Sequence, residues 1–571
     1  DPKQVVFTNQ ARCRDCYRCV RVCPVKAIRI EGGQAFVDAK RCISCGTCVR
    51  ECPQGAKTYR KDIEKAQQVL TNNKFVAVSL APSFAGAYEP WQYLRLPAAL
   101  RRLGFKHVAE TAVGAYKVAC ATTPVITKND QTYICTACPA VVHYIEKYDQ
   151  EKLGNLLPVV SPMIAHAKHI KTKYGLEAKV IFIGPCVAKK MEADRREFNG
   201  LIDCVLTFDE LNEWLKGSHI DLGTCEESSF DEIPAGNSRL FPVEGGALAT
   251  SSLETNLIDD RLIFVSGFEE IRNVLNTIPR LEKPCVIEPL ICPHGCVNGA
   301  GMDKEGNVFD RRAKIIKYAR TNKPGEPLPE PPLDLTTSFK AQSSGAEVHV
   351  NEEDIRVVLE KTGKARKEDQ LNCGACGYSS CRDQAVAVVL HMAETDMCIP
   401  YMRRLAEQRS DRIIATSPNG IVVLNQALQI LNVNPAFLKM FHANESCVGK
   451  SISSLVDPDP FEKVVSGQIE TFDSVCVHKS VKLVTRQLIY ALHAEKQFVG
   501  IFISMTPGKV NAERLEKIQD ETIQQAEELY QHQIEMAKNF ANFLGEYTAK
   551  GEQLVQKLMD AVKEEKPPKS P

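Results

Sequence analysis

Short apolar runs alternate with amphipathic stretches through the middle of the chain. Residues 75–80 and 180–183 are compact apolar runs typical of buried strands, whereas residues 158–174 have the spacing of a helix. Because strand-like and helix-like segments follow one another in this way, the pattern predicts an α/β core whose strand ends open on a site.

The last third of the chain shows two further patterns. Residues 409–507 predict two strands, then helices, then more strands. Residues 511–563 are charged and almost free of Gly and Pro, with a three/four spacing of mainly apolar positions. These positions are Leu515, Ile518, Thr522, Ala526, Leu529 and Gln533. The spacing predicts a coiled-coil or signalling helix, with a plain amphipathic helix as the alternative, and we expect a homodimer.

Length and charge narrow the classes of function. The chain has 571 residues, enough for about four domains. Lys+Arg and Asp+Glu both number 71, so no overall field favours nucleic acid or an anionic membrane, and we expect neither as a partner. The longest uncharged run, 413–438, is interrupted by Pro418, Gly420 and Pro435, so it does not predict a membrane span.

The 23 cysteines are the unusual feature of the composition. Many of them fall in C-x2-C clusters of a large chain that shows no signal-peptide pattern, which favours metal ligands in a reducing compartment over disulfides. We therefore expect a cytoplasmic protein. The sequence begins at Asp1, so we also expect a few residues to precede it.

One cysteine pattern occurs twice in the first 60 residues. It reads C-x2-C-x2-C-x3-C-P and ends once at Pro24 and again at Pro53. Three thiolates of such a loop converge on one 4Fe-4S cubane, and the fourth cysteine ligates the other cluster. The predicted sets are Cys13, Cys16, Cys19 and Cys52 for one cluster, and Cys42, Cys45, Cys48 and Cys23 for the other. The alternative is structural zinc, whose ligands come in two pairs, and this repeat does not divide that way. The pattern resembles a bacterial two-cluster ferredoxin domain.

Three separated cysteine motifs follow predicted strand ends between residues 75 and 320. They are Thr136-Ala137-Cys138-Pro139, Gly184-Pro185-Cys186-Val187-Ala188-Lys189-Lys190 and Glu288-Pro289-Leu290-Ile291-Cys292-Pro293-His294-Gly295-Cys296. A single motif of this kind usually marks a buried thiol. Three of them behind a two-cluster ferredoxin pattern favour a metal centre.

At these motifs, residues 1–320 resemble the FeFe-hydrogenase family. The resemblance implies an H-cluster, in which four cysteines hold a 4Fe-4S unit and one of them bridges to a two-iron subsite bearing CO, cyanide and an azadithiolate. The implied ligands are Cys138, Cys186, Cys292 and Cys296, with Cys296 as the bridge. Four thiolates are too few for two cubanes, so a second metal unit must take most of its ligands from a cofactor.

The same resemblance assigns roles around the cofactor. Lys189 stands where the family sets an ammonium against one cyanide, and Pro82 and Ser83 match a segment that hydrogen-bonds the other. A related, non-catalytic class of iron–sulfur assembly proteins shares the fold. The presence of Lys189 and of the Cys292-x3-Cys296 pair favours the hydrogenase.

The sequence departs from the family at the proton-relay positions. Ala137 replaces the cysteine that carries protons to the azadithiolate, and a methyl group cannot carry a proton. Leu157 stands where a relay serine is expected four residues before Ser161, while Glu192 is retained. Upstream, Lys117 and Cys120 fall near the positions of the family's relay carboxylates. Near the cofactor, Met163 replaces a Gln and Leu290 replaces a Met. Because losing a positioned acid–base group typically costs about 10² to 10⁴ in rate, we predict slow turnover, unless Cys135, His143 or ordered water supplies another relay.

A further cysteine set follows a Pro- and Ser-rich stretch, 321–345, that predicts a semi-rigid linker. The set consists of Cys373, Cys376, Cys381 and Cys398, and a helix expected over residues 380–397 returns the last of them to the others. It resembles the small 4Fe-4S domain found beside corrinoid and sensory proteins. Tetrahedral zinc is the alternative.

Residues 414–437 resemble the opening of a PAS domain. Asn434-Pro435-Ala436-Phe437 begins a helix, and Gly449-Lys450-Ser451-Ile452 fits the later turn. Such a domain binds a small ligand or only dimerises and transmits. We interpret His442, His478 and His493 as surface or packing residues rather than haem ligands.

These observations predict a multidomain α/β and α+β protein that resembles a sensory FeFe-hydrogenase. The expected domains are a two-cluster ferredoxin domain (1–72), an H-cluster domain (73–320), the linker (321–345), a 4Fe-4S domain (346–405), a PAS domain (406–508) and a coiled-coil helix (509–571). The expected partners are H2, protons and, downstream, a kinase or phosphatase. The alternatives are a metabolic hydrogenase that exchanges electrons with ferredoxin and an inert iron–sulfur scaffold.

Overall fold

The computed structural model describes residues 4–128, 130–251, 261–303, 305–321, 325, 333–345, 350–493 and 495–505. The chain divides into two compact units between Arg404 and Leu405. The predicted coiled coil, 509–571, lies outside the described residues.

The first 60 residues contain two small antiparallel strand pairs and two short helices. β1 (Val6–Thr8) pairs with β4 (Lys57–Tyr59), and β2 (Ile28–Glu31) pairs with β3 (Gln34–Val37). The helices α1 (Arg18–Val22) and α2 (Thr47–Arg50) each begin within a cysteine loop. The residue before α2, Gly46, has a φ of 77° and lies against Ala300 and Val187, where a side chain would not fit. Glycine therefore lets this loop approach the next domain closely.

The central region is built on two parallel sheets. The four-stranded sheet has the order β6 (His107–Glu110), β5 (Val76–Leu80), β8 (Lys179–Gly184), β9 (Cys204–Thr207). The three-stranded sheet has the order β10 (Leu262–Ser266), β11 (Val286–Leu290), β7 (Tyr133–Ile134). Strands β5, β6, β9 and β11 are buried along their whole length, as parallel strands covered on both faces are. The strands predicted at 75–80 and 180–183 are confirmed as β5 and β8.

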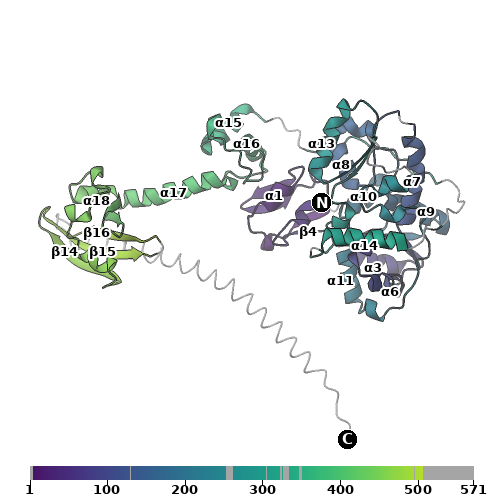
Figure 1. The fold of residues 1–571 in the computed structure, drawn as a ribbon, viewed down its shortest axis with the longest axis horizontal. Coiled ribbons are helices and arrows are strands. Elements are labelled where there is room, and N and C mark those ends of the chain that lie inside the picture. The colour runs from purple at the N-terminus through teal and green to yellow at the C-terminus, as the bar shows by residue number, and fades with distance from the viewer. Residues whose placement is uncertain are drawn as a thin grey trace, which may run out of the picture. The chain divides into compact units, whose positions relative to one another are not determined.

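Helices surround these sheets (Figure 1). They are α3 (Ile63–Asn72), α4 (Phe84–Ala87), α5 (Pro90–Tyr93), α6 (Leu96–Leu103), α7 (Ala112–Ile126), α8 (Pro139–Tyr148), α9 (Pro162–Tyr174), α10 (Ala188–Ala193), α11 (Phe208–Gly217), α12 (Gly246–Thr250), α13 (Phe268–Thr277) and α14 (Val308–Thr321). The helix expected from residue 158 begins only at Pro162, because Val159 is held in an extended bridge to Thr336 and proline favours the first helical position.

The described part of the predicted linker is not a free spacer. Residues 333–345 run extended against the central region, where the Val160 N–H donates to the Leu335 carbonyl at 3.0 Å and the Gln342 N–H donates to the Glu146 carbonyl at 2.8 Å. Leu335 is buried. This segment therefore belongs to the core of the first unit, since backbone pairing and an anchored leucine hold it there.

The small cysteine domain contains α15 (Glu352–Lys361) and α16 (Cys381–Val389), and α17 (Ile399–Thr416) follows it. The helix expected over 380–397 is shorter than predicted. It ends at Val389 because the chain turns at His391, whose φ is 56°, and only a short 3-10 turn, Thr395–Met397, precedes Cys398.

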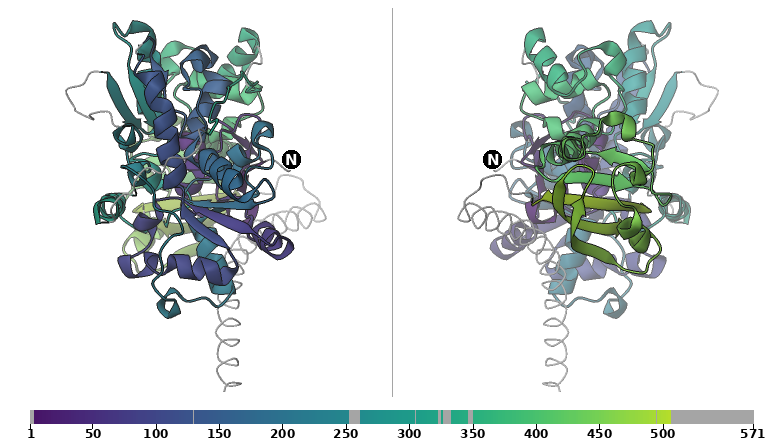
Figure 2. Two further views of the ribbon diagram at one scale, coloured as in Figure 1. Left: turned by 90° about the vertical axis from the view of Figure 1, so that its right-hand side faces the viewer. Right: turned by 90° about the vertical axis from the view of Figure 1, so that its left-hand side faces the viewer.

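The second unit is an antiparallel sheet with the order β13 (Ile430–Val433), β12 (Gly420–Leu424), β16 (Gln497–Ser504), β15 (Leu483–Leu492), β14 (Thr471–His478). The right-hand view of Figure 2 shows this sheet. The helices α18 (Pro435–Met440) and α19 (Asp459–Val465) pack on one of its faces, where Phe437 and Phe461 contact Phe502. The predicted order of strands and helices is confirmed, but residues 414–416 belong to α17 rather than to the first strand.

Candidate active centre and cluster ligands

The three cysteine motifs of the central region stand directly after parallel strands. Cys138 follows β7, Cys186 follows β8, and Cys292 follows β11. Because carboxyl ends of parallel strands form the usual site of an α/β sheet, this placement directs the motifs to one region. Residues 296–298 form a 3-10 turn that carries Cys296 back toward the others.

The structure brings these four thiols together. Burial raises the pKa of Cys292, and the neighbouring sulfurs of Cys296, Cys186 and Cys138 raise it further. Burial likewise raises the pKa of Cys186 to about 11, with Cys138 as the next cause. Thiols that resist ionisation so strongly are stabilised as thiolates by a metal, which supplies the missing positive charge. The donor set therefore fits a thiolate-bound iron–sulfur unit.

Lys189 lies beside this thiol set in a fixed position. Its side chain is buried, and its Nζ donates to Glu192 Oε2 at 2.7 Å and to the Ala137 carbonyl at 3.2 Å. The ammonium lowers the pKa of Cys138, as a secondary effect that opposes burial. Lys189, Glu192 and Ala137 are thus neighbours.

Ser83, a predicted cofactor contact, and Ser161, which lies four residues after the predicted relay position Leu157, have buried hydroxyls. Ser83 follows Pro82 at the start of α4, and Ser161 precedes Met163 at the start of α9. Neither hydroxyl oxygen has a hydrogen-bond partner among the residues that the structure describes. A buried hydroxyl left in this state costs about 1–3 kcal/mol, which a bound acceptor such as cyanide would remove. Their environment therefore also fits a cofactor with polar ligands.

The predicted relay positions line a small apolar cavity. Ala137 and Leu157 face it together with Val118, Phe241 and Leu248. Cys135, which also lines it, is buried, and burial raises its thiol pKa. Cys120 is exposed and does not line this cavity. The other candidate, His143, lines a different cavity, beside Cys42 and Lys147. Leu290 is buried at the end of β11.

Glu288 is a polar residue near the centre that sequence reasoning missed. Its carboxylate accepts the Leu248 N–H at 3.0 Å and the Ala247 N–H at 3.3 Å, yet burial raises its pKa to about 7. Its charge also raises the pKa of Cys135 and Cys296. The sequence signal that could have found it is a carboxylate inside an otherwise apolar strand.

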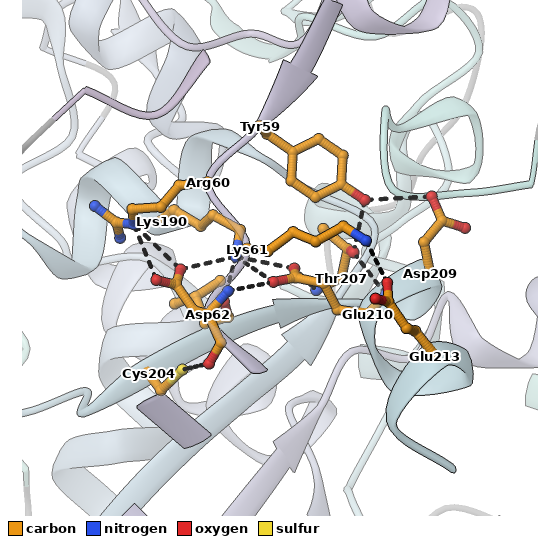
Figure 3. Close-up of polar contacts among 11 residues, drawn as sticks. Tyr59, Arg60, Lys61, Asp62, Lys190, Cys204, Thr207, Asp209, Glu210 and Glu213 are labelled. Carbon is orange, nitrogen blue, oxygen red and sulfur yellow. Dashed lines mark hydrogen bonds and ion pairs between the residues drawn. The ribbon is translucent and has the colours of Figure 1, made fainter. Parts of the chain in front are cut away.

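Lys190, the residue after Lys189, forms a second buried network (Figure 3). Its Nζ lies 2.8 Å from Asp62 Oδ2 and 2.9 Å from Glu210 Oε2, and it donates to the Val205 carbonyl at 2.7 Å. Lys190 and Glu210 are fully buried. Lys190 follows Lys189 directly in α10, so the network fixes the helix that presents Lys189.

The ferredoxin-like cysteines group crosswise. The pKa of Cys19 is raised first by burial and then by Cys13, Cys16 and Cys52. The pKa of Cys48 is raised by burial and then by three sulfurs of the other predicted set, Cys42, Cys45 and Cys23. Cys45 also packs with the apolar cluster around Cys138 and Cys292. The second set is thus the one next to the active centre.

The last cysteine set also converges. Burial raises the pKa of Cys376, and Cys398 and Cys373 raise it further. The buried Lys364 donates from Nζ to Cys398 Sγ at 2.9 Å and also lies near Cys381. Within the described ranges, no group of three or more His, Cys, Asp or Glu side chains is arranged to hold a single metal ion. In the same part of the chain, no helix has the length and apolar character needed to cross a bilayer.

Four family models match separate parts of the chain. Residues 74–300 match the model described as iron only hydrogenase large subunit, C-terminal domain. Residues 12–68 match a 4Fe-4S dicluster domain, residues 369–400 match a model described as a putative Fe-S cluster, and residues 408–475 match a PAS domain.

Relatives of two kinds are found. The "Probable cytosolic Fe-S cluster assembly factor oxy-4" of Caenorhabditis elegans is 28% identical over 274 residues, covering 38% of this chain and 59% of that protein. The "NADP-reducing hydrogenase subunit HndD" of Solidesulfovibrio fructosivorans is 26% identical over 381 residues, covering 55% of this chain and 60% of that protein. The chain thus spans about three fifths of the length of these curated relatives.

Solved structures of FeFe-hydrogenases are also matched. A variant of HydA1 from Chlamydomonas reinhardtii is 20% identical, with a TM-score of 0.38, over 50% of this chain and all of that one. On the matches to the family models, the chain contains the C-terminal domain of an iron-only hydrogenase large subunit, preceded by a 4Fe-4S ferredoxin domain and followed by a PAS domain.

Proposed function

We propose that this chain is a sensory FeFe-hydrogenase, which interconverts H2 with protons and electrons slowly and passes its redox state to the PAS domain. The observation that carries the proposal is the gathering of four thiols from three motifs beside Lys189. Two unsatisfied hydroxyls, Ser83 and Ser161, support it, since they are placed to donate to a ligand.

The protein's part is to bind and orient the cofactor and to exclude water. The 4Fe-4S unit would be held by Cys138, Cys186, Cys292 and Cys296, with Cys296 also anchoring the two-iron subsite. When bound, this H-cluster supplies the redox chemistry of H2. Lys189, held by Glu192, would donate to one cyanide, and the segment of Pro82 and Ser83 would donate to the other.

Proton movement is the step that this chain supports poorly. The Ala137 methyl group and the Leu157 side chain line one cavity and stand where the family carries proton-relay residues, and neither has an acid or base group. A positioned acid–base group typically accelerates a reaction by a factor of about 10² to 10⁴. Turnover should therefore be slow even with a complete cofactor. Slow turnover suits a sensor, which needs to equilibrate with H2 rather than consume it.

The redox signal would pass from the cluster sites to the PAS domain through the C-terminal part of the chain. The ligand Cys398 directly precedes α17, which runs to Thr416, and the first PAS strand begins at Gly420. A change in charge at Cys398 therefore acts at the first turn of a helix that leads to the PAS domain. A kinase or phosphatase would be the partner that reads this change, and ferredoxin would be the electron carrier if the chain also serves metabolism.

The rival proposal is an iron–sulfur scaffold without hydrogen chemistry, which the match to an assembly factor favours. Exchange between H2 and D2O, followed by mass spectrometry, separates the two. Protein loaded with the diiron cofactor should form HD slowly but well above the same protein carrying only its cubanes. Equal HD formation in the two samples, when iron analysis shows that the first holds the diiron cofactor and both hold their cubanes, would support the scaffold and contradict the hydrogenase.

A further inference from the structure

The small cysteine domain packs tightly against the ferredoxin region. Lys26 Nζ donates to the Gly377 carbonyl at 2.8 Å, and Arg21 Nη1 donates to the Ala375 carbonyl at 3.0 Å. At the other end of the contact, the Glu394 carboxylate accepts the N–H groups of Gly32, at 2.6 Å, and Gly33, at 3.2 Å. Backbone and side-chain bonds together therefore fix one orientation of the two cysteine loops.

This orientation sets Cys376 near Cys23. The two cysteines belong to one apolar cluster, in which Tyr378 is buried between their loops. Gly377 has a φ of 95°, and a Cβ at this position would lie 2.9 Å from a methyl group of Val20, so only glycine permits the approach. Cys23 belongs to the cysteine set next to the active centre, whereas Cys16, of the outer set, is exposed.

The small domain also places a buried ammonium group, that of Lys364, beside its cysteine sulfurs. Lys364 lies in the loop after α15, is 5% exposed, and donates to Cys398 Sγ at 2.9 Å. Hydrogen bonds to cluster sulfurs and the net charge of the site are among the factors that set the reduction potential of an iron–sulfur cluster. A nearby ammonium stabilises the more negative, reduced state, and it does so strongly where water is excluded.

We propose that the Cys373–Cys398 site accepts electrons from the Cys23, Cys42, Cys45 and Cys48 site, which we call the inner ferredoxin site. Lys364 raises the reduction potential of the Cys373–Cys398 site, so that this site is reduced before the inner ferredoxin site. The transfer moves one electron from the reduced inner ferredoxin site to the oxidised Cys373–Cys398 site, with no bond made or broken and no proton taken up. This inference deepens the proposed function and rests on it only for the source of the electrons. The inner ferredoxin site then becomes a branch point between the exposed outer site and the helix that leads to the PAS domain.

A redox titration followed by electron paramagnetic resonance tests the role of Lys364. The full chain, carrying its cubanes but not the diiron cofactor, is poised with dithionite and mediator dyes. The variant Lys364→Met should lower the equilibrium constant for reduction of the Cys373–Cys398 site at least tenfold. For one electron this lowers its midpoint potential by about 59 mV. The matched control, Lys361→Met, removes an exposed lysine at the end of α15 and should leave the potential unchanged. Equal potentials in wild type and Lys364→Met, with unchanged iron content, would overturn the proposal.

The wild-type protein provides a second test that needs no variant at position 364. When fully reduced, adjacent paramagnetic sites broaden each other's signals, so the ferredoxin signal of the Cys23 site should be narrower in Cys376→Ala than in the wild type, with only the broadening by the other cubanes left. Equal line widths in the wild type and Cys376→Ala, or zinc in place of iron at Cys373–Cys398, would overturn the inference. Because neither measurement uses H2 or the diiron cofactor, such a failure leaves the hydrogenase proposal standing.

Discussion

Replacing Lys190 by Met removes the ammonium drawn between Asp62 and Glu210 in Figure 3. Asp62 retains its ion pair with Arg60 at 3.0 Å, but Glu210 is completely buried and retains only hydrogen bonds, such as the Asp62 N–H at 2.6 Å. Removing one partner of a buried ion pair costs about 3–5 kcal/mol, because the remaining charge is uncompensated. For a region of this size, we expect the thermal midpoint to fall by about 6–20 °C.

The assay is thermal unfolding of the full chain, followed by circular dichroism at one scan rate. The matched control is Lys61→Met, which removes an ammonium from the exposed ion pair with Glu213 shown in the same view. Exposed pairs contribute about 0–1 kcal/mol, so this variant should unfold close to the wild type. Adding Glu210→Gln to Lys190→Met should recover part of the loss, since it removes the uncompensated charge. If Lys190→Met unfolds at the same temperature as Lys61→Met, the network does not stabilise the fold as described.

Three further predictions concern activity and pH. Ala137→Cys should raise the H2-evolution rate of matured protein by at least about tenfold, because it restores an acid–base group beside the centre; an unchanged rate would mean that protons take another route. If the buried Glu288 carboxyl, whose pKa burial raises to about 7, supplies the slow proton route that is left, Glu288→Gln should lower the same rate further, by about 10² or more, with the infrared bands of the cofactor retained, since an amide cannot pass on a proton; a rate equal to the wild type would exclude Glu288 from the path. Burial lowers the pKa of His143 to about 3, and neither ring nitrogen has a hydrogen-bond partner in the described part of the chain; the nearest carboxylate oxygen, Glu146 Oε2, lies 3.8 Å from Nδ1. As the pH falls, His143 therefore takes up its proton in the unfolded chain, at about pH 6.5, while it stays neutral in the folded protein. This difference lowers the free energy of unfolding by about 1 kcal/mol between pH 7 and pH 5.5. His143→Phe should remove this part of the pH dependence in urea titrations, and an unchanged slope would contradict it.

The candidate ligand cysteines could be recognised in the sequence because cluster chemistry constrains local sequence. A cubane needs several thiolates on one short loop, so the spacing of Cys13, Cys16 and Cys19 is visible without a fold. Lys189 and Ala137 were found in the same way, since each adjoins a ligand motif. The prediction that Cys138 and Cys292 share one site rested on family resemblance alone. More than 150 positions separate these residues, and no spacing rule connects them.

What the sequence did not show depends on long-range packing. Nothing local marks Lys190 as the partner of Asp62, which lies 128 positions away, or Glu288 as a buried carboxyl beside the centre. The linker was predicted from its composition, yet Leu335 is buried because the central region offers an apolar site and free backbone groups. The helix over 380–397 was predicted too long, since helical spacing does not reveal the turn at His391.

The most direct test of the central claim is the infrared spectrum of the matured full chain, in the region of CO and cyanide stretching. The account predicts a set of CO and cyanide bands in wild-type protein, lost in Cys296→Ala, and cyanide bands displaced in Lys189→Met. A protein that binds its full iron yet shows no such bands after maturation would contradict the claim that four thiols at 138, 186, 292 and 296 anchor a diiron cofactor.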